Sequence, residues 1–158
     1  MRSIVGLCNH TGMTGVSLKK YEYINHTADV EFKSYGKDIG ELFKNSFLAL
    51  FNVISEADKI NDKNLKKVTI KESANDLEEL MWYGLQDAIS LSDADDIFFY
   101  DADIVEIKNK DKCTLKAVLY GTKNKPKKVG FEIKAVSRYN LKITSAKDGY
   151  SCTVVVDV

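Results

Sequence analysis

The fold of this chain is decided by residues 28–55, which read ADVEFKSYGKDIGELFKNSFLALFNVIS. At its start, apolar Ala28, Val30 and Phe32 alternate with charged residues, which predicts a strand with one buried and one solvated face. After Asp38 the apolar spacing changes to three or four residues, which predicts an amphipathic helix with Asp38 as its N-cap. So many large apolar side chains on one stripe indicate a helix pressed firmly onto a sheet.

The same two periodicities recur along the rest of the chain. A second stripe at helical spacing follows Asn75, the expected cap, and contains Gly84, which close packing against another element would explain. Strands are expected at residues 68–71, 97–107, 112–120 and 129–136, and at residues 140–144 and 150–158, which form a hairpin around Asp148 and Gly149. This order predicts an α+β fold, a mainly antiparallel β-sheet with two amphipathic helices packed on it.

Length and composition describe a neutral globular protein. The chain has 158 residues, and 23 Lys and Arg balance 23 Asp and Glu, so the formal net charge is zero. A protein that grips nucleic acid through phosphates usually has a pI above about 9, and a polybasic membrane binder also needs excess positive charge. No apolar run approaches the roughly 20 residues of a membrane span, and the three cysteines form no CxxC pair. We therefore expect a cytoplasmic protein with reduced thiols, and no membrane partner.

The glycine and proline content suggests how the chain is divided. Residues 1–19 contain three glycines without clear periodicity, and we expect them to form a flexible N-terminal extension. The chain has one proline and no Pro-rich linker, so residues 20–158 are expected to form a single domain.

A basic segment, KNKPKK, spans residues 123–128. It would contact RNA or an acidic partner, or it is a mobile loop between two strands, and the neutral net charge weighs against direct nucleic-acid binding. The two histidines, His10 and His26, are not accompanied by a nucleophile on a strained turn such as GxSxG. The sequence therefore predicts no Ser-His-Asp site.

Two aspartates fall on the polar faces of strands that are far apart in the sequence. Asp29 lies on the polar face of the first strand, and Asp157 shares the polar face of the last strand with Ser151 and Thr153. If these strands are neighbours, the two carboxylates and the terminal carboxylate would repel one another unless a cation lay between them. Hard oxygen ligands favour calcium or magnesium over zinc. The spacing alone leaves open the alternative that both side chains are simply solvated.

Three separated stretches carry a family resemblance. They are YEYINHTADVEFKSYGKDIGELFKNSFLALFNVI at residues 21–54, with HTADV at residues 26–30 its most specific part, EIKAVS at residues 132–137, and the ending, NLK at residues 140–142 with VVVDV at residues 154–158. In this order they resemble the archease family over about residues 20–158. The resemblance implies a small α+β protein cofactor of the RtcB-type RNA ligase, which joins tRNA halves through its own guanylylated histidine.

The resemblance also implies which residues act. It assigns a divalent metal, calcium or magnesium, to Asp29, Asp157 and the terminal carboxylate of Val158. Beside what the resemblance implies, we hypothesise that the surface that activates the ligase includes His26, Glu132 and Lys134. By this resemblance the protein is not an enzyme. It promotes guanylylation and multiple turnover of the ligase, which itself holds GTP and the tRNA.

Alternatives to this reading stay open. Glu132 and Lys134 would otherwise form a surface salt bridge with each other. A chaperone-like protein, or an accessory protein of a tRNA-modification enzyme, would need an exposed apolar patch, and a stand-alone metallohydrolase would use three oxygen ligands to activate water. Family members often read Thr-Tyr-His where this chain has Ser137, Arg138 and Tyr139, so no function of that histidine is carried over.

Overall fold

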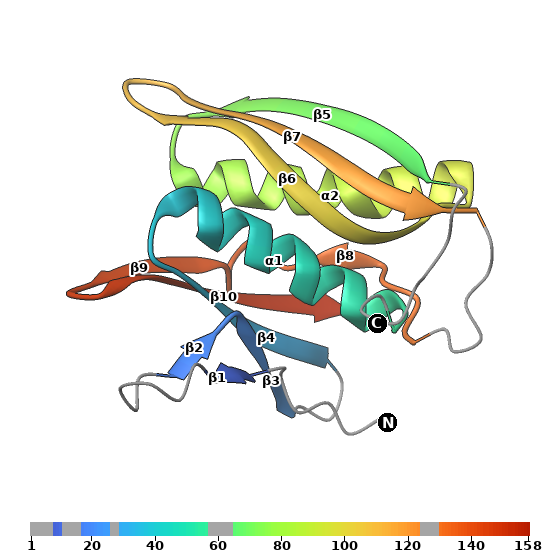
Figure 1. Cartoon of the computed structure of the whole chain (residues 1–158), viewed down its shortest axis with the longest axis horizontal. Helices are drawn as coiled ribbons and strands as arrows, with labels where there is room; N and C mark the ends of the chain where they lie inside the picture. Colours follow the sequence, from blue (N-terminus) through green and yellow to red (C-terminus); the bar gives the residue numbers. More distant parts are fainter. Residues whose placement is uncertain (1–7, 11–16, 26–28, 57–64, 124–129) are drawn as a thin grey trace.

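The computed structural model describes residues 8–10, 17–25, 29–56, 65–123 and 130–158 (Figure 1). In chain order the elements are β1 (Cys8–His10), β2 (Ser17–Lys19), β3 (Tyr21–Asn25), β4 (Asp29–Gly36), α1 (Ile39–Ile54), β5 (Lys66–Ala74), α2 (Leu77–Asp95), β6 (Phe98–Asn109), β7 (Cys113–Thr122), β8 (Ala135–Val136), β9 (Lys142–Ala146) and β10 (Gly149–Asp157). The expected α+β class is confirmed, and all the strand pairs described are antiparallel. Over these residues, no helix is long and apolar enough to cross a membrane.

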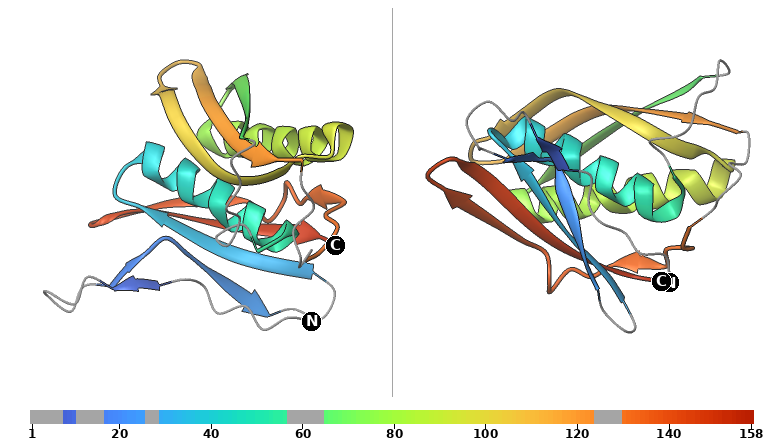
Figure 2. Two further views of the ribbon diagram at one scale, coloured as in Figure 1. Left: turned by 45° about the vertical axis from the view of Figure 1, so that its right-hand side comes forward. Right: turned by 60° about the horizontal axis from the view of Figure 1, so that its bottom comes forward.

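Two separate sheets enclose the helices. The lower sheet has the strand order β3-β4-β10-β8, with β9 also paired to β10, and the upper sheet has the order β5-β7-β6. Both views of Figure 2, like Figure 1, show α1 between the two sheets, with α2 beside it under the upper sheet. The sequence predicted helices packed on a sheet, and the structure shows a three-layer arrangement in which each sheet contributes one buried face.

The helix α1 contacts both sheets. On the upper side, the rings of Phe51 and of Phe99 in β6 have their centroids 5.5 Å apart. On the lower side, the hydroxyls of Ser46 and of Ser34 in β4 share a hydrogen bond of 2.6 Å. A helix covered on two faces must be apolar around most of its circumference, which explains why the phenylalanines and leucines of this segment are so densely spaced.

Both helices begin at an aspartate that caps the first turn. Asp38 accepts a hydrogen bond from the Glu41 N–H at 2.8 Å, as the sequence predicted. In α2 the cap is Asp76, which accepts from the Glu79 N–H at 2.8 Å. The expectation that Asn75 caps this helix is wrong by one residue, because Asp76 is the residue that has the extended backbone of a cap and reaches the third amide of the helix.

Gly84 marks a close approach of α2 to two neighbouring elements, the strand β7 and the helix α1. A Cβ atom at this position would lie 3.2 Å from Cδ2 of Leu115 in β7 and 3.2 Å from Cζ of Phe47 in α1. Ordinary van der Waals contact begins at 3.4 Å. The close packing that the sequence suggested for this glycine is therefore present.

One expected strand is much shorter than its pattern. Of residues 130–136, which are the described part of this range, only β8 forms a strand, and Gly130 and Phe131 bond to the end of α1 instead. The Gly130 N–H donates to the Ile54 carbonyl at 2.7 Å, and the Phe131 N–H donates to the Val53 carbonyl at 2.9 Å. The last carbonyls of a helix have no partner within it, so this segment satisfies them at the cost of its own strand pairing.

The cysteines described behave as small core residues. Cys113 and Cys152 are free and buried, and burial raises the pKa of the Cys152 thiol to about 12, which suppresses thiolate chemistry there. Within the N-terminal extension the structure describes β1 and β2, which pair with each other. Residues 124–128 of the basic segment and the side chain of Cys8 lie outside what is described.

Candidate carboxylate site

The strand β4 pairs over its full length with β10, which brings the two predicted aspartates together. The ladder runs from Tyr150 opposite Gly36 to Asp157 opposite Asp29. Directly opposite residues of an antiparallel pair project from the same face, with Cβ atoms about 4.5–5.5 Å apart. The condition set by the sequence argument, that these strands be neighbours, is met.

The outward orientation of both carboxylates follows from the strand period. Phe32 of β4 and Val156 of β10 are fully buried and face the helices, so residues of the opposite parity face away from the core. Asp157 is exposed and Asp29 is half-buried on this outer face. Two like charges therefore share one end of the lower sheet.

The strand β8 lies on the other side of Asp157. Ala135 is the cross-strand partner of Asp157 there, and the Lys134 N–H donates to the Asp157 carbonyl at 2.8 Å. The side chains of Glu132 and Lys134 are exposed. In the part of the chain that the structure describes, no ion pair or side-chain hydrogen bond is formed by Asp29, Asp157, Glu132 or Lys134. The alternative of a salt bridge between Glu132 and Lys134 is thus not realised, and these charges remain available to a partner.

The other predicted site residues are placed as follows. Val158 follows Asp157 directly and packs its side chain against the core, so its carboxyl group stays at the same end of the ladder. His26 lies within residues 26–28, outside the described residues, and its role stays a prediction.

The site offers oxygen ligands of one chemical kind. Among the side chains described, no three His, Cys, Asp or Glu residues form a group that could hold a metal ion. The predicted metal site, with Asp29, Asp157 and the terminal carboxylate of Val158 as its ligands, therefore stays a prediction. Such a donor set suits calcium or magnesium, which prefer hard oxygen ligands. Like charges directly opposite in a sheet destabilise it, and a cation between them would remove that cost.

Two side chains of α2 hold β8 in place, and sequence reasoning missed them. The Val136 N–H donates to Oε1 of Gln86 at 2.8 Å, and the Val136 carbonyl accepts from Nε1 of Trp82 at 2.9 Å. The side chains of Trp82 and Gln86 bind the backbone groups of β8 to which another strand would pair, so β8 is the edge strand of the sheet beside Asp157. The spacing of Trp82 and Gln86, four residues apart on one helix face, was the available signal, but it does not reveal what they bind.

A second carboxylate pair lies between β5 and α2. Burial, followed by the negative charge of Glu72 and a hydrogen bond with it, raises the pKa of Asp87 to about 6. A pair of this kind repels at neutral pH and is relieved by one proton.

A groove of about 920 Å³ lies at the opposite end of the β4–β10 ladder. It is lined by the first turn of α1, the second half of β6 and Tyr150. Tyr150 stands seven positions from Asp157 along β10, which corresponds to roughly 24 Å of strand. The groove is therefore separate from the carboxylate site.

Comparisons with known proteins match almost all of the domain expected from the sequence. Residues 21–158 match the model of the Archease protein family (MTH1598/TM1083). The chain is 36% identical to the protein archease of Methanosarcina acetivorans over 143 residues, which cover 89% of this chain and 97% of the relative. It is 31% identical to the protein archease of Pyrococcus abyssi over 134 residues, covering 84% of this chain and 93% of the relative.

Two solved structures share the fold. The solution structure of Methanobacterium thermoautotrophicum protein 1598 matches with a TM-score of 0.70 and 24% identity, covering 88% of this chain and 99% of that one. The crystal structure of an archease from Thermotoga maritima, described as a possible chaperone, matches with a TM-score of 0.55 and 21% identity, covering 85% and 94%. At these identities the likeness establishes the three-dimensional arrangement and nothing more.

Proposed function

The chain belongs to the archease family, and on this premise we propose that it is a protein cofactor of an RtcB-type RNA ligase in tRNA splicing. In this role it promotes guanylylation of the ligase and its multiple turnover, and it is not itself an enzyme. The ligase holds the GTP and the RNA, and the two proteins meet in the cytoplasm.

The observation that carries this proposal is the register of Asp157 opposite Asp29. Residues from the two ends of the domain converge on one exposed position, where folding alone gains nothing from two facing carboxylates. The unpaired side chains of Glu132 and Lys134 lie on the neighbouring segment that leads into β8. An acidic pair with exposed charges beside it is suited to enter the site of another protein, because Asp157, Glu132 and Lys134 are already exposed.

The residues of this chain have distinct parts in the proposed site. Asp29, Asp157 and the terminal carboxylate of Val158 hold the divalent ion, and Glu132, Lys134 and His26 contribute to the surface that meets the ligase. When bound, calcium or magnesium supplies positive charge toward nucleotide phosphates in the ligase. The main chain of Lys134 is held next to Asp157, because its N–H donates to the Asp157 carbonyl at 2.8 Å.

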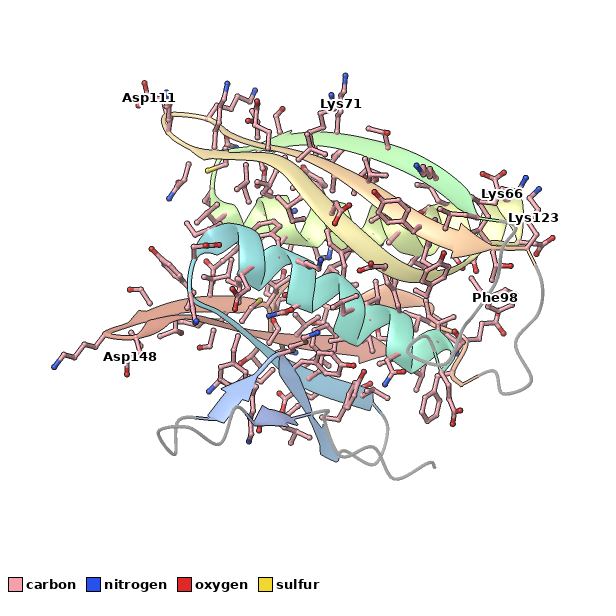
Figure 3. The ribbon with its side chains drawn as sticks, viewed as in Figure 1. Lys66, Lys71, Phe98, Asp111, Lys123 and Asp148 are labelled. Atoms are coloured by element: carbon pink, nitrogen blue, oxygen red, sulfur yellow. The ribbon has the colours of Figure 1, made fainter. Side chains whose placement is uncertain are left out.

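The test is ligase guanylylation with and without this protein. We expect the variants Asp29→Asn and Asp157→Asn each to reduce the stimulation by about tenfold or more, because each removes one anionic ligand while keeping the size of the side chain. The matched control is Asp148→Asn, at the tip of the β9–β10 hairpin, which Figure 3 places at the other end of the lower sheet. Full stimulation by both site variants, with the fold verified by circular dichroism, would refute the assignment of the site.

A chaperone-like role is the second candidate, and the description of the Thermotoga maritima relative as a possible chaperone favours it. A chaperone needs a contiguous exposed apolar patch. Among the described residues, the exposed large apolar side chains come from separate elements: Ile24, Leu65, Val105 and Tyr139. We therefore rank this role second. Co-purification with a tRNA-modification enzyme, and not with the ligase, would reverse the order.

A further inference from the structure

The turn at residues 137–140 presents an aromatic side chain entirely to solvent. Tyr139 is 100% exposed, whereas the next most exposed large apolar side chain described, Val105, is 55% exposed. A ring left wholly in water adds nothing to the core, so folding does not account for a tyrosine at this position. A single exposed apolar residue is common on protein surfaces, and its meaning depends on its surroundings.

The surroundings of Tyr139 are unusual in their residue types. Arg138 donates from Nη2 to Oε2 of Glu79 at 2.7 Å, and its guanidinium lies 5.3 Å from the centre of the Trp82 ring. The Trp82 ring in turn meets the Tyr83 ring edge to face, with centroids 5.4 Å apart. Tryptophan, tyrosine and arginine are the types that dominate binding energy at protein interfaces. We call Trp82, Tyr83, Arg138 and Tyr139 the aromatic turn surface.

The main chain on both sides of this turn is fixed to α2. Before the turn, Val136 is bonded through both its N–H and its carbonyl, to Gln86 and Trp82. After the turn, the Ile143 N–H donates to Oε2 of Glu78 at 2.9 Å. A surface already held in one conformation loses little conformational freedom when a partner binds, which favours affinity.

The aromatic turn surface adjoins the carboxylate site. Ala135 is the cross-strand partner of Asp157, and Tyr139 follows four residues later, at most roughly 14 Å along an extended chain. A partner large enough to receive the carboxylates therefore also reaches the turn.

We propose that the aromatic turn surface is a docking site for a protein, with the Tyr139 ring as the anchor that enters an apolar pocket of the partner. The inference rests on the proposed function, since the partner we assign is the ligase that receives the carboxylates. A protein fits this surface better than RNA does. The charge of Arg138 is already paired with Glu79, whereas RNA binding depends on free positive charge directed at phosphates.

The experiment compares binding with stimulation in the full chain. We expect Tyr139→Ala to raise the Kd for the ligase by about 10–100-fold, as the loss of an aromatic anchor does. Stimulation of guanylylation at a saturating concentration should be unchanged, because Tyr139 is not part of the carboxylate site. The opposite pattern is expected for Asp157→Asn, which should bind with nearly normal affinity and fail to stimulate. Val105→Ala, on the exposed part of β6, is the matched control and should change neither quantity.

The outcomes separate the two proposals. Unchanged affinity of Tyr139→Ala for the ligase would overturn the docking site. Loss of affinity for a single-stranded RNA in this variant, with normal binding of the ligase, would overturn it in favour of an RNA site. Full stimulation by Asp157→Asn, with weakened binding in Tyr139→Ala, would overturn the carboxylate function and leave the docking site standing. Because Tyr139 is wholly exposed, the thermal unfolding midpoint of the Tyr139→Ala variant should match that of the wild type. A matching midpoint confirms that the substitution has changed only the surface.

Discussion

Asp29 and Asp157 stand directly opposite each other at the last position of the β4–β10 ladder. Like charges at such a position destabilise an antiparallel pair. Nearby cations do not offset this within the described residues, because the exposed Lys134 forms no ion pair with either carboxylate. A divalent ion shared by the two carboxylates would change the repulsion into a net gain in the stability of the folded state.

The first prediction concerns that gain. Calcium or magnesium at a hundredfold excess over its Kd should stabilise the folded wild type by about 2.7 kcal/mol, since the ion binds only the folded chain. For a domain of this size, that corresponds to a rise of roughly 5–10 °C in the unfolding midpoint. Asp157→Asn should lose the rise. In EDTA the same variant should be at least as stable as the wild type, because the repulsion is removed. Thermal denaturation followed by circular dichroism measures the unfolding midpoint with the metal ion and in EDTA.

The control for the metal-dependent stabilisation is Asp111→Asn in the turn between β6 and β7, and Figure 3 shows Asp111 at the tip of that hairpin. This variant removes the same charge and should keep the full metal-dependent rise. Equal rises in the wild type and in Asp157→Asn would show that the ion binds elsewhere.

The carboxylate pair illustrates how far the sequence could lead. The period of two in a strand is strict, so the sequence alone places Asp29 and Asp157 on polar faces. Whether the two strands are neighbours, and in which register, depends on long-range pairing that no local pattern encodes. The family resemblance supplied that link before the ladder confirmed the adjacency.

The features that sequence reasoning missed depend on tertiary contacts. Trp82 and Gln86 bond to Val136, which lies 54 and 50 residues away in the sequence. Similarly, the pattern of residues 129–136 is that of a long strand, but the end of α1 captures its first part. In both cases a helix competes with a neighbouring strand for the same backbone groups, and only the packing of the layers decides which one binds.

The second prediction concerns the pH dependence of stability. The pKa of Asp87 is raised from 3.8 to about 6 by burial and by the charge of Glu72. Between these values the folded chain binds a proton that the unfolded chain has released, so stability falls as pH rises from about 4 to about 6. The loss is complete above that range. Asp87→Asn should remove it and stabilise the protein at pH 7.5 by about 1 kcal/mol, a figure that allows for solvent screening of a half-exposed group.

Urea unfolding at pH 4, 5, 6 and 7.5 checks this prediction. Asp95→Asn, at the exposed end of α2, is the matched control and should keep the pH dependence of the wild type. If the free energy of unfolding of Asp87→Asn falls between pH 4 and 6 as steeply as that of the wild type, another group causes the pH dependence.

The third prediction uses two glycines that share a secondary structure but differ in their neighbours. At Gly40, in the first turn of α1, a Cβ atom would lie 3.4 Å from Oδ1 of Asp38, at ordinary contact distance. Gly40→Ala should therefore stabilise the chain by about 0.5 kcal/mol through helix propensity. At Gly84 the same atom would crowd Leu115 and Phe47 at 3.2 Å on two sides. Overpacking of about 1–3 kcal/mol there should exceed the propensity gain, leaving Gly84→Ala destabilised by about 1 kcal/mol.

Free energies of unfolding in urea test the opposite signs. Combining Gly84→Ala with Leu115→Val should cost less than the sum of the two single changes, because valine lacks the Cδ2 atom that the new methyl group would crowd. Stabilisation by Gly84→Ala equal to that by Gly40→Ala would mean that α2 can move away from β7 at no cost. If the free-energy changes of Gly84→Ala and Leu115→Val add exactly, the strain comes from Phe47 instead, because Cζ of its ring is the other atom 3.2 Å from the new methyl group.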